Sequence, residues 1–591
     1  MPERDGLIVG IDLGTTFSLV SVLPPGSREA RPLVLENALG ERLTPSVVAL
    51  ADDGGLLVGA PALAMATTHP DRVVRSFKRE MGTDKVYTLG PHRLSPQELS
   101  AMVLRALKAD AEALLGAPVV EAVVTVPAYF GGSQRAATRQ AAELAGLVTE
   151  RIINEPTAAA MAYGLHNLDK EQRAVVLDLG GGTFDVTVLE ILEGVVEVQS
   201  SAGDARLGGE DFTETLARLA AARIAADHGH DPQQQPLGWA RLLGAAEQAK
   251  RRLTEREEAR LVLPRLGLAP GVERDVELTV TRDQAEACWQ PLLARVREPI
   301  WRAFRDGGLD PRAMDEVLLV GGATRMPCFI REVASLCQRM PARHLPPDEA
   351  VAMGAAVQAA LKRGQRAVED LVVTDVAPFS LGIEVMQELG GHRLDGFFSP
   401  ILERGTVIPA SREQTFSTSE DGQTGIHIQV FEGEHSLTKD NRLLGEFHLR
   451  DLDRAPRGQP VRVRFTYDLN GLLEVEMTVP HQQRTETLLI ERSPGQLSPE
   501  QIARARAAMA RLKFHPREAL PNTTALQRAE ALYQELRGGP REEVGRTMSA
   551  FRLALETQDE AFIENQRALL LHVLDRFRDA DASYDEPDGA P

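Results

Sequence analysis

Two glycine-rich segments of the same type lie far apart in the chain, and both could grip phosphate. They are Gly10–Thr16 (GIDLGTT) and Asp178–Asp185 (DLGGGTFD), and each offers an Asp, then glycines, then a Thr. Glycine has no Cβ, so a turn can approach a ligand closely, and successive backbone N–H groups in such a turn form an anion-binding concavity. The Thr hydroxyl adds a donor, and the Asp can hold a hydrated magnesium ion.

Apolar runs indicate how these segments are held. Leu7–Val9 and Val175–Leu177 precede them and are typical of buried strands. A third apolar run, Leu319–Val320, leads into the paired glycines Gly321 and Gly322. One such turn would be weak evidence, but the repetition predicts two lobes that close on one nucleotide.

The region up to about residue 360 alternates strand-like and helix-like stretches. Val123–Val126 and Val317–Val320 favour strands, whereas Glu98–Leu115 and Thr138–Leu147 favour helices. Alternation of this kind predicts an α/β architecture with largely buried sheets.

Beyond residue 375 the pattern changes to strict alternation of apolar and polar residues. It occurs in Ile426–Val430, Val461–Tyr467 and Leu473–Val479. Asp468–Gly471 joins the last two runs, and its Asn-Gly pair is a strong hairpin signal. We therefore expect an antiparallel β module with one buried face.

Near residue 498 the pattern becomes helical. Ser498–Gln501 forms a capping box with Pro at the first helical position, and apolar residues follow at helical spacing. We expect helices to about residue 580, broken at Pro516, Pro521 and Gly538–Pro540. The last residues are acidic and contain Pro and Gly, so we expect them to be disordered.

Composition narrows the classes of function. The chain has 591 residues and a net charge of −19, so we expect two to four domains and neither nucleic acid nor an anionic membrane as a partner. The charged N-terminus and the absence of a long apolar run predict a cytoplasmic protein without a signal peptide. The three cysteines suit a reducing compartment as small core residues; they are Cys288, Cys328 and Cys337. The sequence has no GxxxxGK[ST] or HExxH motif, so a P-loop ATPase and a zinc hydrolase are poor interpretations.

Several longer motifs resemble those of the DnaK family, the seventy-kilodalton heat-shock chaperones. They follow one another in family order from residue 6 to about residue 490 and are highly specific. The motifs are Gly10–Thr16, Val126–Phe130, Asn154–Ala160, Asp178–Asp185, Leu207–Phe212, Val320–Pro327, Pro347–Val351, Ser380–Glu384 and Phe416–Thr418. Within the family the chain looks closest to the HscC type, through Phe398–Arg404, Tyr467–Val475 and a short helical tail with Leu512–Arg517.

The resemblance implies a multidomain fold. An actin-like α/β ATPase domain of four subdomains would span residues 1–367, and an interdomain linker residues 368–375. An antiparallel β-sandwich domain that binds substrate would span residues 376–490. A short helical lid would follow at 491–580, with a disordered tail at 581–591.

The resemblance also implies ATP and magnesium between the phosphate turns, with potassium as an optional second cation. Asp12 and Asp178 would hold the magnesium through water, since magnesium prefers oxygen ligands and keeps its waters. Lys78 matches the lysine that reaches the γ-phosphate. Glu155 matches the residue that orients the attacking water, and we expect it in a turn because Pro156 follows it. The same catalytic neighbourhood includes Thr183 and Asp185.

Nucleotide contacts are implied on both sides of the cleft. Those near the phosphates are Gly14, Thr15, Thr16, Gly180, Gly181, Gly182, Thr183 and Gly209. Those near adenosine are Glu247, Lys250, Arg251 and Thr254, with Gly321, Gly322, Arg325 and Asp348 opposite them. The spacing from Glu247 to Thr254 places the first group on one helix face and its end.

The β module should bind extended apolar peptide. Backbone hydrogen bonds would let such a site accept many sequences, and one apolar pocket would make it prefer apolar side chains. By resemblance, the groove is lined by Ile383, Val385, Met386, Phe416, Ser419, Ile426 and Ile428. Plain core packing is the alternative for each of them. Met386 and Ile426 are the preferred groove residues.

Leu371, Val372 and Val373 form an apolar strip between acids, of which Asp375 is the last. A free linker is usually polar, so this strip requires a docking surface. We hypothesise that it docks on the ATPase domain in the ATP state and couples the two domains. Pro127 and Arg151 match family positions tied to interdomain signalling.

The chain also departs from the family pattern. Phe17 stands where the family has Asn beside the phosphate turn, which could alter nucleotide exchange. Ser419 and Val385 replace the Ala and Thr of the arch over the peptide, and the linker lacks a run of leucines. The acidic co-chaperone signature of the family C-terminus is missing.

The favoured interpretation is an ATP-driven chaperone for unfolded or apolar polypeptides in protein folding and the stress response. A J-domain co-chaperone and an optional nucleotide exchange factor are implied as partners. One alternative is an actin-like small-molecule kinase, which would have no use for a β module and helical lid. Another is a regulatory module that binds ATP without hydrolysing it, against which Lys78 and Glu155 argue.

Overall fold

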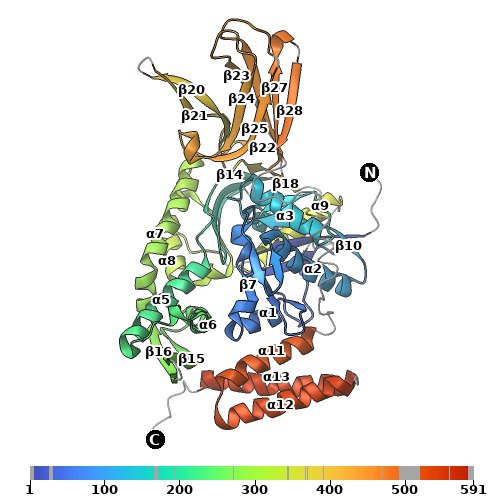
Figure 1. Cartoon of the computed structure of the whole chain (residues 1–591), viewed down its shortest axis with the longest axis vertical. Helices are drawn as coiled ribbons and strands as arrows, with labels where there is room; N and C mark the ends of the chain where they lie inside the picture. Colours follow the sequence, from blue (N-terminus) through green and yellow to red (C-terminus); the bar gives the residue numbers. More distant parts are fainter. Residues whose placement is uncertain are drawn as a thin grey trace.

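The computed structural model describes residues 6–24, 31–164, 171–192, 195–269, 272–342, 345–365, 368, 371–389, 392–450, 452–468, 470–482, 484–490, 520–557 and 560–583. Two α/β lobes occupy the middle of the molecule, with a β module at one end and a helical bundle at the other (Figure 1). None of the described helices is long and apolar enough to cross a bilayer.

The first lobe is built on a mixed sheet whose parallel strands end at one edge. β10 pairs in parallel with both β1 and β11, while β2 runs antiparallel to β1. The carboxyl ends of parallel strands are where α/β folds bind ligands, and here they carry Asp12, Pro127 and Glu155. The strands are β1 (Leu7–Leu13), β2 (Phe17–Val22), β3 (Leu33–Val34), β4 (Thr44–Pro45), β10 (Val119–Val126) and β11 (Ile152–Asn154). The flanking helices are α2 (Pro96–Leu115) and α3 (Gly132–Leu144), which begins earlier than the helix expected at Thr138–Leu147.

The second lobe carries a five-stranded sheet in the order β17-β12-β13-β14-β18. Its glycine-rich segment forms the turn between β12 and β13, which pair antiparallel. The strands are β12 (Gln172–Leu179), β13 (Phe184–Leu192), β14 (Val195–Asp204), β17 (Glu316–Val320) and β18 (Val372–Val373). The helices are α5 (Gly209–His228), α6 (Pro236–Arg252), α7 (Arg282–Asp306) and α8 (Pro327–Cys337). Beyond α6 lies the hairpin of β15 (Glu258–Ala269) and β16 (Val272–Thr281).

Cysteines contribute to the core of this lobe, as expected. Cys328 and Cys337 are buried in its apolar cluster, and Cys288 packs against that cluster. Burial raises the pKa of each of the three thiols to about 11, so they stay protonated near neutral pH. That protonation state suits packing rather than thiolate chemistry.

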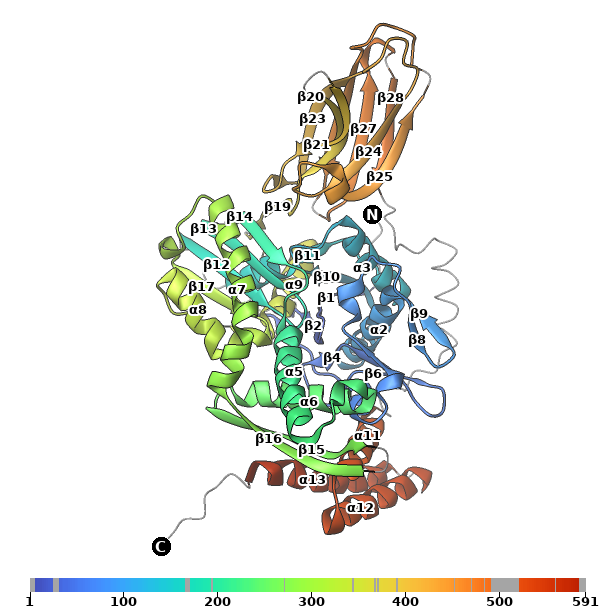
Figure 2. The ribbon, with the colours of Figure 1, turned by 60° about the vertical axis from the view of Figure 1, so that its left-hand side comes forward.

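Helices α4 (Glu155–Gly164) and α9 (Ala350–Lys362) pack against each other, and α9 lies between the two sheets (Figure 2). The crossing is so close that a Cβ on Gly354 would lie 1.6 Å from the carbonyl oxygen of Ala158. Only glycine fits there, because any side chain would push the helices apart. Glu155 is the first residue of α4, so our expectation of a turn is wrong. Pro156 is compatible with a helix because Pro is tolerated in the first turn.

The β module consists of two four-stranded antiparallel sheets, in the orders β21-β20-β24-β25 and β23-β26-β27-β28. Their inner faces share one apolar core that contains Val430, Val463 and Phe465. The predicted hairpin joins β26 to β27, and Gly471 adopts a positive φ of 78° in its turn. The strands are β20 (Leu381–Leu389), β21 (His392–Leu402), β23 (Ala410–Ser417), β24 (Ile426–Glu432), β25 (Arg442–Leu449), β26 (Pro460–Tyr467), β27 (Leu473–Val479) and β28 (Arg484–Ile490).

The C-terminal helices lie at the far end of the molecule from the β module (Figure 1). α11 (Leu520–Glu535), α12 (Gly538–Thr557) and α13 (Glu560–Ser583) share an apolar core, and α11 also contacts α1 (Ala60–Ala64) of the first lobe. The break expected at Gly538–Pro540 falls at residues 536–537, since Gly538 already begins α12, and Pro521 lies in the first turn of α11 and does not break it. Residues 581–583 are helical, which corrects the start of the expected tail. The expected capping box Ser498–Gln501 and Pro516 lie outside the described residues.

The linker is part of the second lobe. Its strand β18 pairs in parallel with β14, with Val372 opposite Val195 and Val373 opposite Val196. Leu371 is only 4% exposed and belongs to the apolar cluster around α4 and α9. Val372 is 52% exposed. One residue later, β19 (Asp375–Val376) pairs with β22 (Val407–Ile408) of the β module.

Candidate functional site

A cavity of about 400 Å³ lies between the two lobes, where both glycine-rich segments meet. Every residue predicted to contact nucleotide lines it except Gly182, which packs against Thr15 and Arg79. Asp12, Lys78, Glu155 and Asp178 line it as well. The two segments approach so closely that a Cβ on Gly181 would lie 1.9 Å from Thr16 Oγ1. The structure therefore brings the predicted phosphate, metal and catalytic residues into one cavity.

Buried carboxylates gather at this cavity, from Asp12, Glu155 and Asp178 in its wall and from Asp185 near them. Loss of solvation and the charge of Glu155 raise the pKa of Asp12 to about 7 and that of Asp185 to about 8. The same two causes raise the pKa of Asp178 well above its usual value. Repulsion among buried carboxylates is relieved by a cation, and an all-oxygen donor set is what magnesium prefers. The residues present therefore fit a magnesium ion.

A lysine side chain lies among these carboxylates. Lys78, from the short 3₁₀ turn Phe77–Glu80, places its Nζ 2.6 Å from Glu155 Oε1, and both side chains are buried. Ser76, which precedes the turn, has a φ of 59°, an uncommon conformation for a residue other than glycine. The Ser76 hydroxyl donates to Glu210 Oε2 at 2.6 Å, which anchors this turn to the other lobe.

Helix α6 forms the side of the cavity where adenosine is expected. Lys250 Nζ donates to Gly209 O at 2.8 Å and pairs with Glu247 Oε2 at 2.7 Å. Burial tends to raise the pKa of Glu247, but Lys250, Thr213 and Arg251 together lower that pKa below its usual value. Arg251 Nε donates to Glu247 Oε1 at 2.8 Å, and Thr254 donates its hydroxyl hydrogen to Arg251 O at 2.6 Å. On the opposite side Arg325 pairs with Asp348 at 2.6 Å.

Contacts that the sequence did not predict hold the lobes together across the cavity. Arg79 of the first lobe pairs with Asp211 at 2.6 Å and donates to Gly181 O at 3.3 Å. The Phe17 ring of the first lobe lies 5.7 Å from the guanidinium carbon of Arg251. Asp211 belongs to the motif Leu207–Phe212, which carried the family resemblance without indicating this contact.

Comparison with known proteins agrees with this geometry. The sequence matches the Hsp70 protein family over residues 8–568. The chain belongs to the Hsp70 family. It is 43% identical over 480 residues to proteins named Chaperone protein DnaK from Thermotoga neapolitana and Thermotoga petrophila, with 80% of this chain and 78% of each relative covered. It is therefore an ATP-dependent molecular chaperone and an ATPase, and the alternatives of a small-molecule kinase and a non-hydrolysing module fall away.

The groove residues predicted in the β module differ in how deeply they are buried. Ile383 and Ile428 are each 4% exposed and lie in the core, so the alternative of core packing applies to them. Val385, Phe416 and Ile426 are partly buried against that core. Met386 lies at an irregularity in the ladder between β20 and β21. Ser419 is also partly exposed, and its backbone N–H donates to Gln423 Oε1 at 3.0 Å.

Asp375 joins the β module to the first lobe. Its Oδ2 accepts hydrogen bonds from Asn154 Nδ2 at 2.7 Å and from Thr157 Oγ1 at 3.2 Å, and all three residues are buried. Arg135 Nη2 donates to Asn154 Oδ1 at 2.5 Å. The predicted coupling residue Arg151 lies near enough for its charge to act on Asp375, and its Nε has no hydrogen-bond partner among the described residues.

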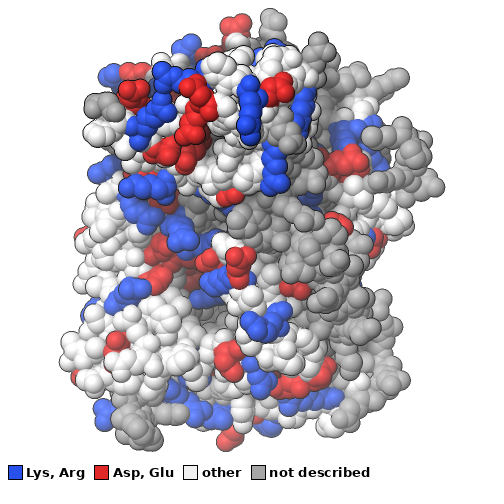
Figure 3. Space-filling view, turned by 45° about the horizontal axis from the view of Figure 1, so that its top comes forward, with Lys and Arg blue, Asp and Glu red and all other residues white. Residues whose placement is uncertain are grey.

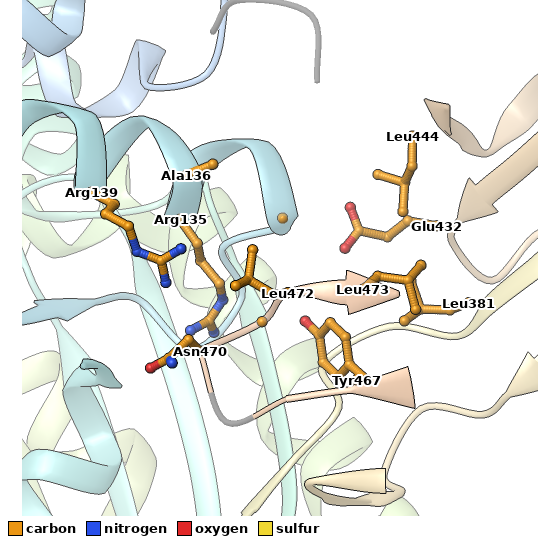
Figure 4. Close-up of a pocket in the computed structure, with 12 residues that line it drawn as sticks. Arg135, Ala136, Arg139, Leu381, Glu432, Leu444, Tyr467, Asn470, Leu472 and Leu473 are labelled. Atoms are coloured by element: carbon orange, nitrogen blue, oxygen red, sulfur yellow. The ribbon is translucent and has the colours of Figure 1, made fainter. Parts of the chain in front are cut away.

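The interface around Arg135 is formed by α3 on one side and the β26–β27 hairpin on the other (Figure 4). Asn470, in the turn of that hairpin, accepts from the backbone N–H of Ile152 at 3.3 Å. Tyr467 and Glu432 face the same small cavity from the β module. The Asn-Gly turn that the sequence marked as a hairpin therefore also serves as a contact surface.

A second contact leads from the cavity to the β module. The backbone N–H groups of Ala128 and Tyr129 donate to the two carboxylate oxygens of Asp185, at 3.2 and 3.3 Å. The Tyr129 ring lies 4.3 Å from that of Phe379, just before β20. The predicted coupling residue Pro127 immediately precedes this segment and is buried.

Proposed function

We propose that ATP in the cavity favours rapid release of extended apolar peptide from the β module through the docked linker, and that hydrolysis converts this state into one that holds peptide more tightly. The observation that supports this most strongly is strand β18, which extends the sheet that carries a phosphate turn. The next strand, β19, pairs with β22 of the β module. A change in the second lobe that weakens the edge of β14 would therefore free the linker and alter the β module.

The residues of the cavity have distinct roles in this proposal. Asp12 and Asp178 would hold magnesium through water, and bound magnesium would neutralise charge on the phosphate oxygens. Lys78 would reach the γ-phosphate, and its pairing with Glu155 would hold that carboxylate in place as the group that orients water. Thr183 and the glycines of both turns would position the phosphates, with potassium as an optional second cation.

The remaining features of the proposal come from sequence resemblance. The chain would be an HscC-type member with an actin-like ATPase domain of four subdomains (1–367), a linker (368–375), a β sandwich (376–490) and a lid (491–580). It would act in the cytoplasm on unfolded polypeptides, with a J-domain co-chaperone and an optional exchange factor. Acidic and basic side chains are interspersed on the face in Figure 3, which supports the expectation that no nucleic acid is bound.

The test is release of a fluorescent apolar peptide from the full chain after ATP and magnesium are added. We expect rapid release with ATP and slow release with ADP. Asp12→Asn, which removes a carboxylate at the expected metal site, should abolish the ATP effect and leave peptide affinity in ADP unchanged. Equal release rates in ATP and ADP, with hydrolysis intact, would contradict the proposed coupling.

A further inference from the structure

Three exposed side chains on the outer face of the β module form a cluster that the chaperone cycle does not use. His427 on β24 lies directly opposite His448 on β25, and their rings stack with centroids 4.2 Å apart and planes 9° from parallel. Glu446 Oε2 lies 3.2 Å from His427 Nε2. A ligand atom from each of these three residues lies within 4.8 Å of the other two.

The two paired strands and the core beneath them hold these three side chains in place. Side chains alternate across a strand, so His427, Glu446 and His448 share the outer face while their neighbours turn inward. Ile428 is 4% exposed and Leu449 is 1% exposed, and both pack in the core of the β module. Directly opposite residues of an antiparallel pair have Cβ atoms about 4.5–5.5 Å apart. The strands thus hold the two imidazoles close enough for one ion to bridge them once the side chains rotate out of the stacked arrangement.

A neighbouring side chain orients the carboxylate. Gln429, two residues after His427 on the same face, donates from Nε2 to Glu446 Oε1 at 3.1 Å. The other oxygen, Oε2, is the one directed at His427. Outer hydrogen bonds of this kind commonly position metal-ligating carboxylates.

The chemistry of the ligands selects the kind of ion. Two imidazole nitrogens and one carboxylate oxygen suit zinc and its first-row neighbours, whereas magnesium and calcium favour oxygen alone. Three protein ligands leave at least one coordination position open to water. We propose that His427, Glu446 and His448 form a surface site for a transition-metal ion, with zinc as the first candidate.

The test uses the full chain, stripped with chelator and then saturated with ADP and magnesium so that the nucleotide cavity is occupied. Zinc chloride is titrated calorimetrically, and we expect one ion to bind per chain at this site. His427→Ala and His448→Ala should each weaken binding by more than tenfold. Gln429→Ala should weaken it by about tenfold, the lower end of the effect of a second-layer partner.

The matched control is His481→Ala, which removes a partly exposed histidine of the same module outside the cluster. It should leave zinc affinity unchanged. Cobalt supplies a second readout, because tetrahedral ligation gives intense visible absorption that His427→Ala should abolish. Melting curves without metal check that each variant is folded. Failure of the wild-type chain to bind zinc, or unchanged binding in both cluster histidine variants, would overturn the proposal.

Discussion

Two adjacent residues of the linker should respond very differently to the same substitution. Leu371 is 4% exposed in the cluster that also contains Val196 and Val368, whereas Val372 is 52% exposed. Replacing Leu371 with Asp removes a buried apolar side chain, whose burial is worth about 1.5–3 kcal/mol. The new carboxylate is either buried without a partner, which costs further free energy, or turns out to solvent and pulls the strand from its docking site. We expect docking of the linker to weaken by at least about 2–3 kcal/mol, or roughly 30- to 150-fold.

Val372→Asp is the matched control. Its side chain is half-exposed, and its part in docking is the backbone pairing with β14, which substitution retains. The measurement is the rate of peptide release after ATP is added, in a stopped-flow instrument, together with steady-state ATP turnover. Leu371→Asp should lose the ATP-triggered acceleration while it still hydrolyses ATP, and Val372→Asp should keep it. Equal loss in the two variants, or no loss in Leu371→Asp, would refute the reasoning from side-chain burial.

Three further perturbations test other parts of the structure. Glu155→Gln should slow single-turnover hydrolysis by about a hundredfold or more and change ATP affinity little, since general acid–base groups contribute on that scale; equal loss of both would contradict its role. Phe17→Leu should speed release of fluorescent ADP about two- to fivefold by removing a contact with Arg251 worth about 0.5–1 kcal/mol, whereas Phe17→Tyr should not. Burial raises the pKa of Asp375 in the docked chain, so its contribution to docking is fully present below the ordinary carboxyl pKa and is lost as pH rises through the raised value. Peptide release measured over a pH series that begins near the ordinary carboxyl pKa and rises from there should show this dependence, and Asp375→Asn should remove it.

Local signals in the sequence were sufficient for the phosphate turns and the hairpin. Glycines followed by Thr, and Asn-Gly between alternating runs, specify backbone conformations that depend little on the rest of the chain. Both turns line one cavity, and the hairpin joins β26 to β27. The start of α4 was mispredicted for an equally local reason. Pro156 disfavours helix at the residue before it, but a helix tolerates Pro in its first turn.

Contacts between distant segments could not be predicted in this way. Arg79 and Asp211 are 132 positions apart, and no periodicity links them. The burial of a side chain in the β module is equally hard to predict from the sequence. Alternation predicts which face of the sheet a residue lies on, but not how far it lies from the edge of the core. Ile426 and Ile428 share one face of β24, yet Ile428 is buried while Ile426 remains partly exposed.

The position of Asp375 explains how docking of the β module can affect ATP hydrolysis in the cavity. Asp375 binds Asn154, and Asn154 directly precedes Glu155, whose carboxylate pairs with Lys78. Thr157, the second donor to Asp375, belongs to the same first turn of α4. Undocking of the β module would leave two buried donors without their acceptor, at a cost of about 1–3 kcal/mol each, unless water or movement of α4 satisfies them. Any such movement carries Glu155 with it, so docking of the β module and the geometry for hydrolysis cannot vary independently.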